Sequence, residues 1–529
     1  MDATGFEAWA LTLAVFLPAV GALVMMAVPR ARELELKTIA LGASLASLAV
    51  GVYLLFAFDY GRAGELQFGV HKGWIDAINA DYILGLDGLS LPLLILSMVI
   101  IPLCVIYSWE HIPEPGNAKA FLILMLILAS GMNGTFVAQD LILFFVFFEV
   151  VLLPMYFMIG VWGGENRRYA SLKFFLFTLF GSALMIVSFV ALYFVATNKA
   201  GTALNTFDMQ ALADAAGGDL ARGTQAIIFA GLFMGFGIKV PMFPFHTWLP
   251  DAHTEAPTVG SVILAAILLK LGTYGFVRIA LPFLPEGAAA WAPWIGLLAV
   301  IGIIYGALGC LAQTDMKRLI AFSSVAHMGF VMLGIATLTP IGINAAVFGM
   351  VAHGIITGML FFLAGSVKER YHTLEISRLG GLLKSAPRMG WILAISAMAS
   401  LGLPGLAGFW GEFPAILSAY APGAGLSEGL FRTYMVIAAV GTVFAAGYLL
   451  WLFQRSAFGE PKPEWEGHTI ADVNRYEWAA WTPLIIAMVL FGWVPGLIFG
   501  MVDGVSVDIA CDIGEAVGTV VEDCEWETG

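Results

Sequence analysis

The chain has 529 residues, of which 60% are hydrophobic and 12% are charged, and it carries a formal net charge of −13 at pH 7. Because soluble domains carry about 25% charged residues, this composition excludes an ordinary soluble protein and predicts an integral membrane protein. The acidic surplus lies mainly in the loops and the C-terminal tail, and no basic patch points to a nucleic-acid partner.

Apolar runs of about 20 residues, the length that crosses a bilayer as a helix, recur from one end of the chain to the other. We therefore expect an all-α polytopic membrane protein with about fourteen transmembrane helices. In chain order these cover residues 6–28, 39–58, 82–109, 120–137, 141–162, 172–196, 226–249, 258–281, 292–312, 319–338, 341–367, 391–417, 434–453 and 481–499.

The charges that flank these runs predict their orientation. Acidic residues precede the first apolar run and Arg30 and Arg32 follow it, the reverse of a secretory signal peptide. Lys and Arg accumulate on the cytoplasmic side of membrane proteins. We therefore expect a multi-pass protein of the bacterial inner membrane with both termini on the periplasmic side, or of the mitochondrial inner membrane if the source is eukaryotic.

The four cysteines include no Cys-x-x-Cys pair, so we expect no iron–sulfur or zinc site built from them. Cys104 and Cys310 are read as small apolar fillers. Cys511 and Cys524 share the tail that is expected outside, where an oxidising compartment would allow a disulfide. Free thiols remain the alternative.

Two of the expected helices contain residues that break helices in mid-membrane, at 239–244 (Lys-Val-Pro-Met-Phe-Pro) and at 403–412. Proline deletes a backbone donor, and Gly408 and Gly411 loosen the second segment. Each helix should therefore be discontinuous. Free backbone groups at that depth are tolerated only against protein or water, so the two breaks indicate a polar passage.

Nearly the same spacing separates Lys239 from Glu412 and Glu149 from His327, which suggests two repeats of five helices. An odd number of helices inserts the second repeat in the opposite sense. We expect helices 1–3 in residues 1–118, the first inverted repeat (helices 4–8) in 119–283, the second (helices 9–13) in 284–457, and the last helix with an acidic tail in 458–529.

Six ionisable residues lie near the expected midplane, each on its own helix. Burial disfavours the charged form of such groups, and a charge within the membrane usually faces another charge or a wet cavity. Together they resemble a proton relay. They are Glu149, Lys239, Lys270, His327, His353 and Glu412.

Each of the six also has a structural interpretation. Glu149 and Lys239 can form a static ion pair that only joins two helices. Lys270 can be a fixed hydrogen-bonded lysine, and the two histidines can be satisfied core donors. Glu412 can likewise be structural. The relay is the favoured hypothesis because the six share one depth.

The segment 246–257 (HTWLPDAHTEAP) is read either as a site of proton uptake or as a folded connector, and the connector is favoured for Asp251 and Glu255. Lys317 and its basic neighbours are read as interfacial anchors. The chain has no phosphate-binding loop, dinucleotide fingerprint or zinc-protease motif. Energy must therefore come from another subunit or from an ion gradient.

The segment 239–278 (KVPMFPFHTWLPDAHTEAPTVGSVILAAILLKLGTYGFVR) resembles the antiporter-like membrane subunits of respiratory complex I. Segments 141–175 and 313–329 (QTDMKRLIAFSSVAHMG) resemble the chain M type, which is equivalent to mitochondrial subunit 4. The resemblance implies fourteen helices with inverted repeats. It also places Glu149, Lys239, Lys270 and Glu412 on the translocation path, with His327 and His353 as relays.

The resemblance further implies that NADH oxidation and quinone reduction occur on other subunits, which hold the flavin, the iron–sulfur clusters and the quinone. No cofactor and no metal is expected on this chain. Its expected partners are the other membrane-arm subunits, including sibling antiporter-like subunits, together with lipids and protons.

The sequence is also compatible with two rival functions. One is a sodium/proton antiporter subunit of the multi-subunit type, although sodium prefers a cage of oxygen ligands and the expected centre is rich in ammonium groups. The other is a structural subunit whose buried charges serve the assembly of the membrane arm alone.

Overall fold

The computed structural model describes residues 5–199, 205–216, 220–423, 425–465, 467–518 and 524. The first helices are α1 (Glu7–Ala27), α2 (Glu33–Ala57), α3 (Ser90–Tyr107), α4 (Ala118–Val137), α5 (Leu141–Val150), α6 (Leu152–Trp162), α7 (Arg167–Lys199), α8 (Met209–Ala216), α9 (Arg222–Lys239), α10 (Trp248–Glu255) and α11 (Thr258–Ile263). They continue with α12 (Leu269–Gly275), α13 (Leu281–Phe283), α14 (Pro285–Leu311), α15 (Met316–Ala336), α16 (Pro340–Tyr371), α17 (Leu382–Ser385), α18 (Pro387–Ser400), α19 (Ala407–Ser418), α20 (Glu428–Ala457), α21 (Arg475–Trp493) and α22 (Gly496–Ala516).

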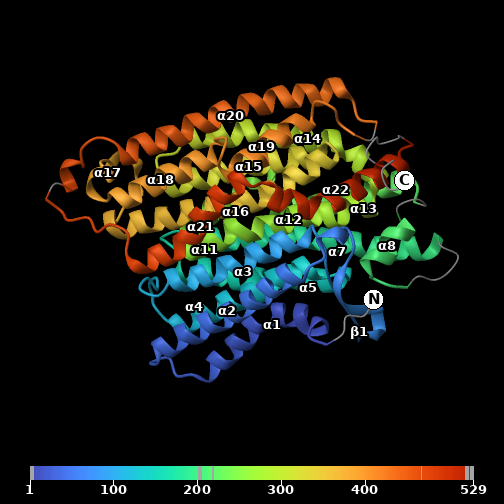
Figure 1. The fold of residues 1–529 in the computed structure, drawn as a ribbon, viewed down its shortest axis with the longest axis horizontal. Helices are drawn as coiled ribbons and strands as arrows, with labels where there is room; N and C mark the ends of the chain where they lie inside the picture. Colours follow the sequence, from blue (N-terminus) through green and yellow to red (C-terminus); the bar gives the residue numbers. More distant parts are fainter. Residues whose placement is uncertain are drawn as a thin grey trace.

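The long helices run side by side along one direction (Figure 1). Among the described residues, 11 helical segments are long and apolar enough to cross a membrane, and α21 with α22, which meet at a 67° bend, make up to 12. The helical membrane architecture is thus confirmed, with 11 or 12 candidate spans where the sequence suggested about fourteen. The two further expected spans are the interrupted ones.

Both interruptions occur where proline and glycine predicted them. Helix α9 ends at Lys239, and α10 begins only at Trp248. Helix α18 ends at Ser400, and α19 begins at Ala407 after a loop in which Gly402 and Gly405 have positive φ. Each expected discontinuous helix is therefore present as two short helices.

The first helices show how proline is accommodated inside a span. Pro18 within α1 has no N–H, so the carbonyl of Ala14 loses its donor one turn earlier. Ser47 Oγ of α2 donates to this carbonyl at 2.7 Å and Asn133 Nδ2 of α4 donates to it at 3.0 Å. Three helices are thereby joined by one freed carbonyl.

A β-hairpin departs from the all-α expectation. Strands β1 (Gln67–Ile75) and β2 (Ala80–Leu86) pair antiparallel in the connection between α2 and α3. The expected span at 82–109 was wrong at its start, because residues 82–86 belong to β2 and α3 begins at Ser90. Alternating apolar residues in this strand were read as the start of a continuous apolar run.

The end of the chain also differs from the expectation of one last helix over 481–499 followed by a polar tail. Helix α21 ends at Trp493, before Pro495, and α22 then extends to Ala516. Helix α22 buries Val502, Ile509 and Ile513, so its acidic residues occupy the other face of an amphipathic helix. A disulfide joins Cys511 to Cys524.

Figure 1 places the start of α1 and the end of α22 at one end of the bundle, together with β1 and α8 (right). The short helix α17 lies at the opposite end (left). The helices at the centre are the most enclosed: α15, α16 and the segment Thr258–Phe283 are almost entirely buried, whereas fewer than half of the residues of α2 and α7 are buried. The central helices carry most of the candidate site.

Candidate functional site

Lys239 is the last residue of α9, at the first helix break, and its side chain is buried. Its Nζ lies 3.4 Å from the carbonyl oxygen of Phe148 and 4.0 Å from the centre of the Phe148 ring. A carbonyl and an aromatic face both attract a cation. The amino group is therefore held by Phe148 on α5, and no carboxylate of the described residues is in contact with it.

Glu149 follows Phe148 in the last turn of α5, where the helix is interrupted before α6. Pro154 contributes to this interruption, because it offers no N–H to the carbonyl of Val150. The Glu149 Oε1 atom is buried without a hydrogen-bond partner, and no ion pair within 4 Å joins it to Lys239 in the described part of the chain. The expected pair is therefore adjacent but apart in this conformation.

Lys270 lies on α12 between two π-helical segments, Leu264–Leu268 and Phe276–Ala280. A π-helical turn widens the helix and frees backbone carbonyls, and such turns are frequent at functional sites. Lys270 Nζ donates to the carbonyl of Ala265 at 2.5 Å and contacts His353 Nδ1 at 2.7 Å. The fully buried amine is thus joined directly to the imidazole of α16.

This contact bears on which ring nitrogen of His353 carries the proton. When Lys270 is protonated it can only donate, so Nδ1 then accepts and the neutral ring carries its proton on Nε2. His353 Nε2 is buried and has no hydrogen-bond partner among the described residues. An unpartnered N–H in the interior is costly unless water reaches it.

His327 on α15 is bonded on both sides of its ring. Its Nδ1 lies 2.6 Å from Glu412 Oε1, and its Nε2 lies 3.2 Å from Ser400 Oγ and 3.1 Å from the Tyr448 hydroxyl. Ser400 ends α18 and Glu412 belongs to α19, so the two sides of the second break both reach this histidine. The break thereby positions a carboxylate and a hydroxyl around one imidazole.

A small cavity is lined by both histidines, whose ring centres are 6.0 Å apart. It has about 20 Å³ available to water, and its polar lining residues are His327, His353, Thr357, Ser400 and Glu412. One ordered water needs about 10–15 Å³ of such volume and two to four polar partners. The cavity therefore has the size and the polarity to hold a water between His353 and Glu412.

The structure thus brings four of the six predicted residues into one line, in the order Lys270, His353, His327 and Glu412. Lys239 lies apart from this line. Helices α9 and α12 are in close contact here, because a Cβ added at Gly272 of α12 would lie only 3.0 Å from Lys239 Cβ. No hydrogen bond links Lys239 to Lys270 among the described residues. Aromatic rings, including Phe144, Phe148 and Phe236, surround this junction.

The segment 246–257 is folded as a connector around its acidic residues. Asp251 pairs with Lys173 at 2.7 Å, and Glu255 accepts from the backbone N–H of Asn166 at 2.9 Å. His253 is fully buried and its ring stacks on Phe361, and neither ring nitrogen has a hydrogen-bond partner in the part of the chain that the structure describes. Asp251 and Glu255 therefore hold α10 in place, as favoured from the sequence.

Sequence reasoning missed Ser400, Tyr448 and Lys317. A lone hydroxyl on an apolar helix carries no signal of its own, so Ser400 and Tyr448 emerge only from their contacts with His327. Lys317 precedes an apolar run and therefore resembles an interfacial anchor, but it is buried and donates to the carbonyl of Ala256. The anchoring interpretation was wrong for this residue.

Lys317 lines a second, larger cavity of about 460 Å³ at the end of the bundle opposite the start of α1 and the end of α22. Glu255, Lys368, Glu369 and His111 also line it. Burial lowers the pKa of the His111 imidazole, although the carboxylates of Glu477 and Glu110 act in the opposite direction. Charged groups of both signs thus surround a space large enough for several waters.

Comparison with known proteins identifies the relatives of this arrangement. Residues 138–438 match the family model described as NADH:quinone oxidoreductase/Mrp antiporter, and residues 70–135 match the amino terminus of NADH-ubiquinone oxidoreductase chain 4. NADH-quinone oxidoreductase subunit M of Rhodobacter capsulatus is 39% identical over 518 residues, which cover 97% of this chain and 98% of that protein. The chain belongs to the subunit M (chain 4) family of antiporter-like complex I membrane subunits.

Other members of the family and solved structures agree. NAD(P)H-quinone oxidoreductase chain 4 1 of Nostoc sp. is 36% identical over 96% of this chain and 93% of its own length. A chain of respiratory complex I from Thermus thermophilus superposes with a TM-score of 0.84 at 31% identity, covering 95% of this chain and all of that one. A chain of the Mrp complex from Dietzia shares the fold at 20% identity, with a TM-score of 0.79.

Family membership makes this chain a subunit of NADH-quinone oxidoreductase and part of the complex I assembly. It is a multi-pass protein of the respiratory membrane. The match to the chain 4 amino terminus begins within β1 and covers β2, α3 and most of α4, outside the region that the model shared with Mrp antiporters describes.

Proposed function

We propose that this subunit moves protons across the respiratory membrane through a buried relay, driven by redox chemistry on other subunits. The observation that carries the proposal is the line from Lys270 through His353 and a water-sized polar cavity to His327 and Glu412. Each member can gain and lose a proton, and neighbours lie within hydrogen-bond reach or one water apart.

In this proposal Lys239 and Glu149 form the gate. The Lys239 ammonium keeps its proton while the Glu149 carboxylate is close and gives it up when the carboxylate moves away, because a desolvated charge without a partner is unstable. The separation of the two residues and the unpartnered Glu149 Oε1 are the features expected of an open gate.

Glu149→Gln tests the gate. Glutamine keeps the size of the side chain but cannot carry a negative charge, so we expect proton-coupled quinone reductase activity in the assembled complex to fall about tenfold or more. Glu165→Gln, in the exposed loop after α6, is the matched control and should leave activity unchanged. Wild-type coupled activity with Glu149→Gln would contradict the gate.

The proposed orientation has both termini on the outer, periplasmic side. Its support is the basic loops expected inside, the start of α1 and the end of α22 at one end of the bundle, and the Cys511–Cys524 disulfide, since disulfides persist in oxidising compartments. After a membrane-impermeant reductant, a membrane-impermeant maleimide should label the tail cysteines in intact cells. Labelling only after permeabilisation would reverse the orientation.

We also propose that the fourteen-helix plan with inverted repeats at 119–283 and 284–457 underlies the two breaks, preceded by helices in 1–118 and followed by residues 458–529. Each proposed repeat contains one interrupted helix, α9–α10 or α18–α19. In this account the flavin, the iron–sulfur clusters and the quinone belong to other subunits, and sibling antiporter-like subunits and lipids surround the chain.

A further inference from the structure

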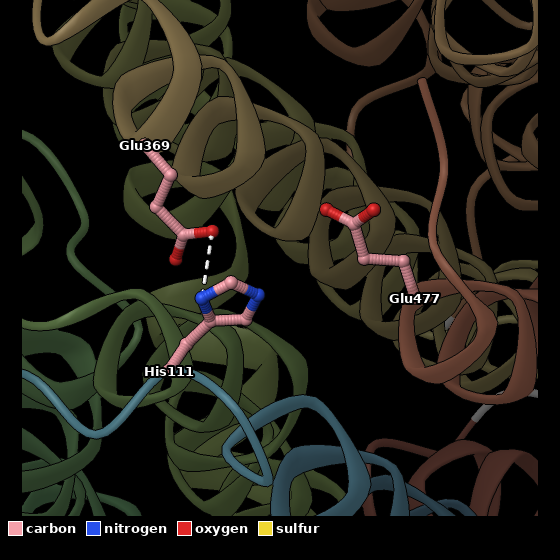
Figure 2. Close-up of side chains that lie close together, drawn as sticks. All are labelled: His111, Glu369 and Glu477. Carbon is pink, nitrogen blue, oxygen red and sulfur yellow. Dashed lines mark ion pairs between the residues drawn. The ribbon is translucent and has the colours of Figure 1, made fainter. Parts of the chain in front are cut away.

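A histidine and two glutamates outside the proposed relay converge from three separate elements (Figure 2). His111 lies in the loop between α3 and α4, Glu369 near the end of α16, and Glu477 in the first turn of α21. One possible ligand atom from each residue lies within 4.8 Å of the other two. Nothing in the proposed proton path uses these residues.

The contacts within the cluster are incomplete. His111 Nδ1 lies 3.1 Å from Glu369 Oε2, yet this oxygen makes no hydrogen bond, so the two atoms approach each other without hydrogen-bond geometry. His111 Nε2 is buried and also lacks a partner. Buried polar atoms are normally satisfied, and a cation bound by His111 Nδ1 and Glu369 Oε2 would give this oxygen the partner that it lacks.

Glu477 is held in place without using all of its acceptor capacity. Arg370 donates to Glu477 Oε1 at 2.8 Å and to Oε2 at 2.7 Å, and the backbone N–H of Asn474 donates to Oε2 at 2.9 Å. A carboxylate offers about four lone-pair sites, so Oε1 retains one for a ligand. Arg370, which donates to both oxygens, would then orient the carboxylate, as partners of metal ligands commonly do.

The charges of the cluster favour a cation. Arg370 neutralises Glu477, whereas no Lys or Arg of the described chain lies within ion-pair distance of Glu369. The Tyr107 hydroxyl donates to Glu369 Oε1 and orients it. His111 and Glu369 also line the cavity of about 460 Å³, from which water can reach the cluster.

We propose that His111, Glu369 and Glu477 bind one divalent transition-metal cation of the zinc class, with water from the cavity as the fourth ligand. An imidazole nitrogen with two carboxylates suits Zn²⁺, whereas Mg²⁺ and Ca²⁺ prefer oxygen alone. Bonds of about 2.1 Å in a tetrahedron place ligand atoms roughly 3.4 Å apart. The 3.1 Å between His111 Nδ1 and Glu369 Oε2 is close to that separation.

Equilibrium dialysis of the purified, chelator-treated complex against radioactive Zn²⁺ tests this site. The wild type should bind one more zinc per complex than His111→Gln or Glu369→Gln. We expect the dissociation constant for that zinc to rise at least about a hundredfold in either variant, because even the loss of a residue that only orients a ligand lowers metal affinity by 10–100-fold. Both variants leave the Arg370–Glu477 pair intact, and native gels verify assembly.

Two further variants make the test specific. His111→Cys replaces one zinc ligand with another and should retain the extra zinc, whereas a histidine needed only for packing would not be rescued. His71→Gln, which removes an exposed histidine of the β-hairpin that pairs with Asp81, is the matched control. Equal zinc binding by the wild type, His111→Gln and Glu369→Gln would overturn the site, and competition by millimolar Mg²⁺ would overturn the zinc class.

Discussion

Methionine in place of Lys239 is expected to lower proton-coupled NADH:quinone reductase activity at least about tenfold, while the complex still assembles. Methionine has nearly the same length and lacks the ammonium. It retains the packing against the Phe148 ring and removes a buried charge whose contacts are a carbonyl and an aromatic face. Removing one partner of a buried ion pair is strongly destabilising, but no carboxylate of the described residues is in contact with Lys239, so methionine leaves no such pair broken.

The two interpretations of Lys239 therefore predict opposite results. If the lysine carries protons, activity falls and the amount of assembled complex stays at the wild-type level. If it serves only to hold helices together, the amount of complex falls and the activity per complex is retained. Native gels and turnover of the same membranes measure both quantities. Lys72→Met is the matched control, because Lys72 also lies over an aromatic ring, Trp9, but is exposed.

Glutamine in place of Glu412 is expected to reduce coupled activity by about tenfold or more, again without loss of assembly. Glutamine Oε1 can still accept a hydrogen bond from His327 Nδ1, so the 2.6 Å contact and the packing of α15 against α19 are retained. The amide cannot take up a proton. The relay would then be blocked after His327.

The control for Glu412→Gln is Glu460→Gln. Glu460 also pairs with a basic residue, Lys384, but on the exposed surface, where an ion pair contributes about 0–1 kcal/mol. Its loss should change neither assembly nor activity. Full coupled activity in the Glu412→Gln complex would remove Glu412 from the proton path and leave it as a structural acceptor.

Local chemistry was sufficient to predict the helix breaks and the buried charges. Proline at 241 and 244 and the glycines around 402–411 interrupt helices wherever they lie, and a charge inside an apolar run is visible without a structure. The amphipathic helix α22 was missed because its acidic residues were read as a polar tail. The β-hairpin was missed because an apolar strand and an apolar helix start resemble each other over a few residues.

The pairing of the buried residues could not be predicted in the same way. His327 and Glu412 are 85 residues apart, and Lys270 and His353 are 83 apart, so their contacts depend on how α12, α15, α16 and α19 pack. The opposite charges of two buried residues suggested Glu149 and Lys239 as partners, whereas the carbonyl of Phe148 contacts the Lys239 amino group in this conformation. Neutral side chains such as Ser400 complete the line from Lys270 to Glu412. Their positions likewise depend on packing.

The most direct test of the account is a structure of the intact complex at a resolution that shows ordered water in the cavity between the two histidines. The account predicts a water within hydrogen-bond distance of His353 Nε2 that also reaches Glu412 or Thr357, completing the line from Lys270. A dry cavity, with His353 Nε2 still unpartnered and no solvent between the two imidazoles, would contradict a proton path through these residues.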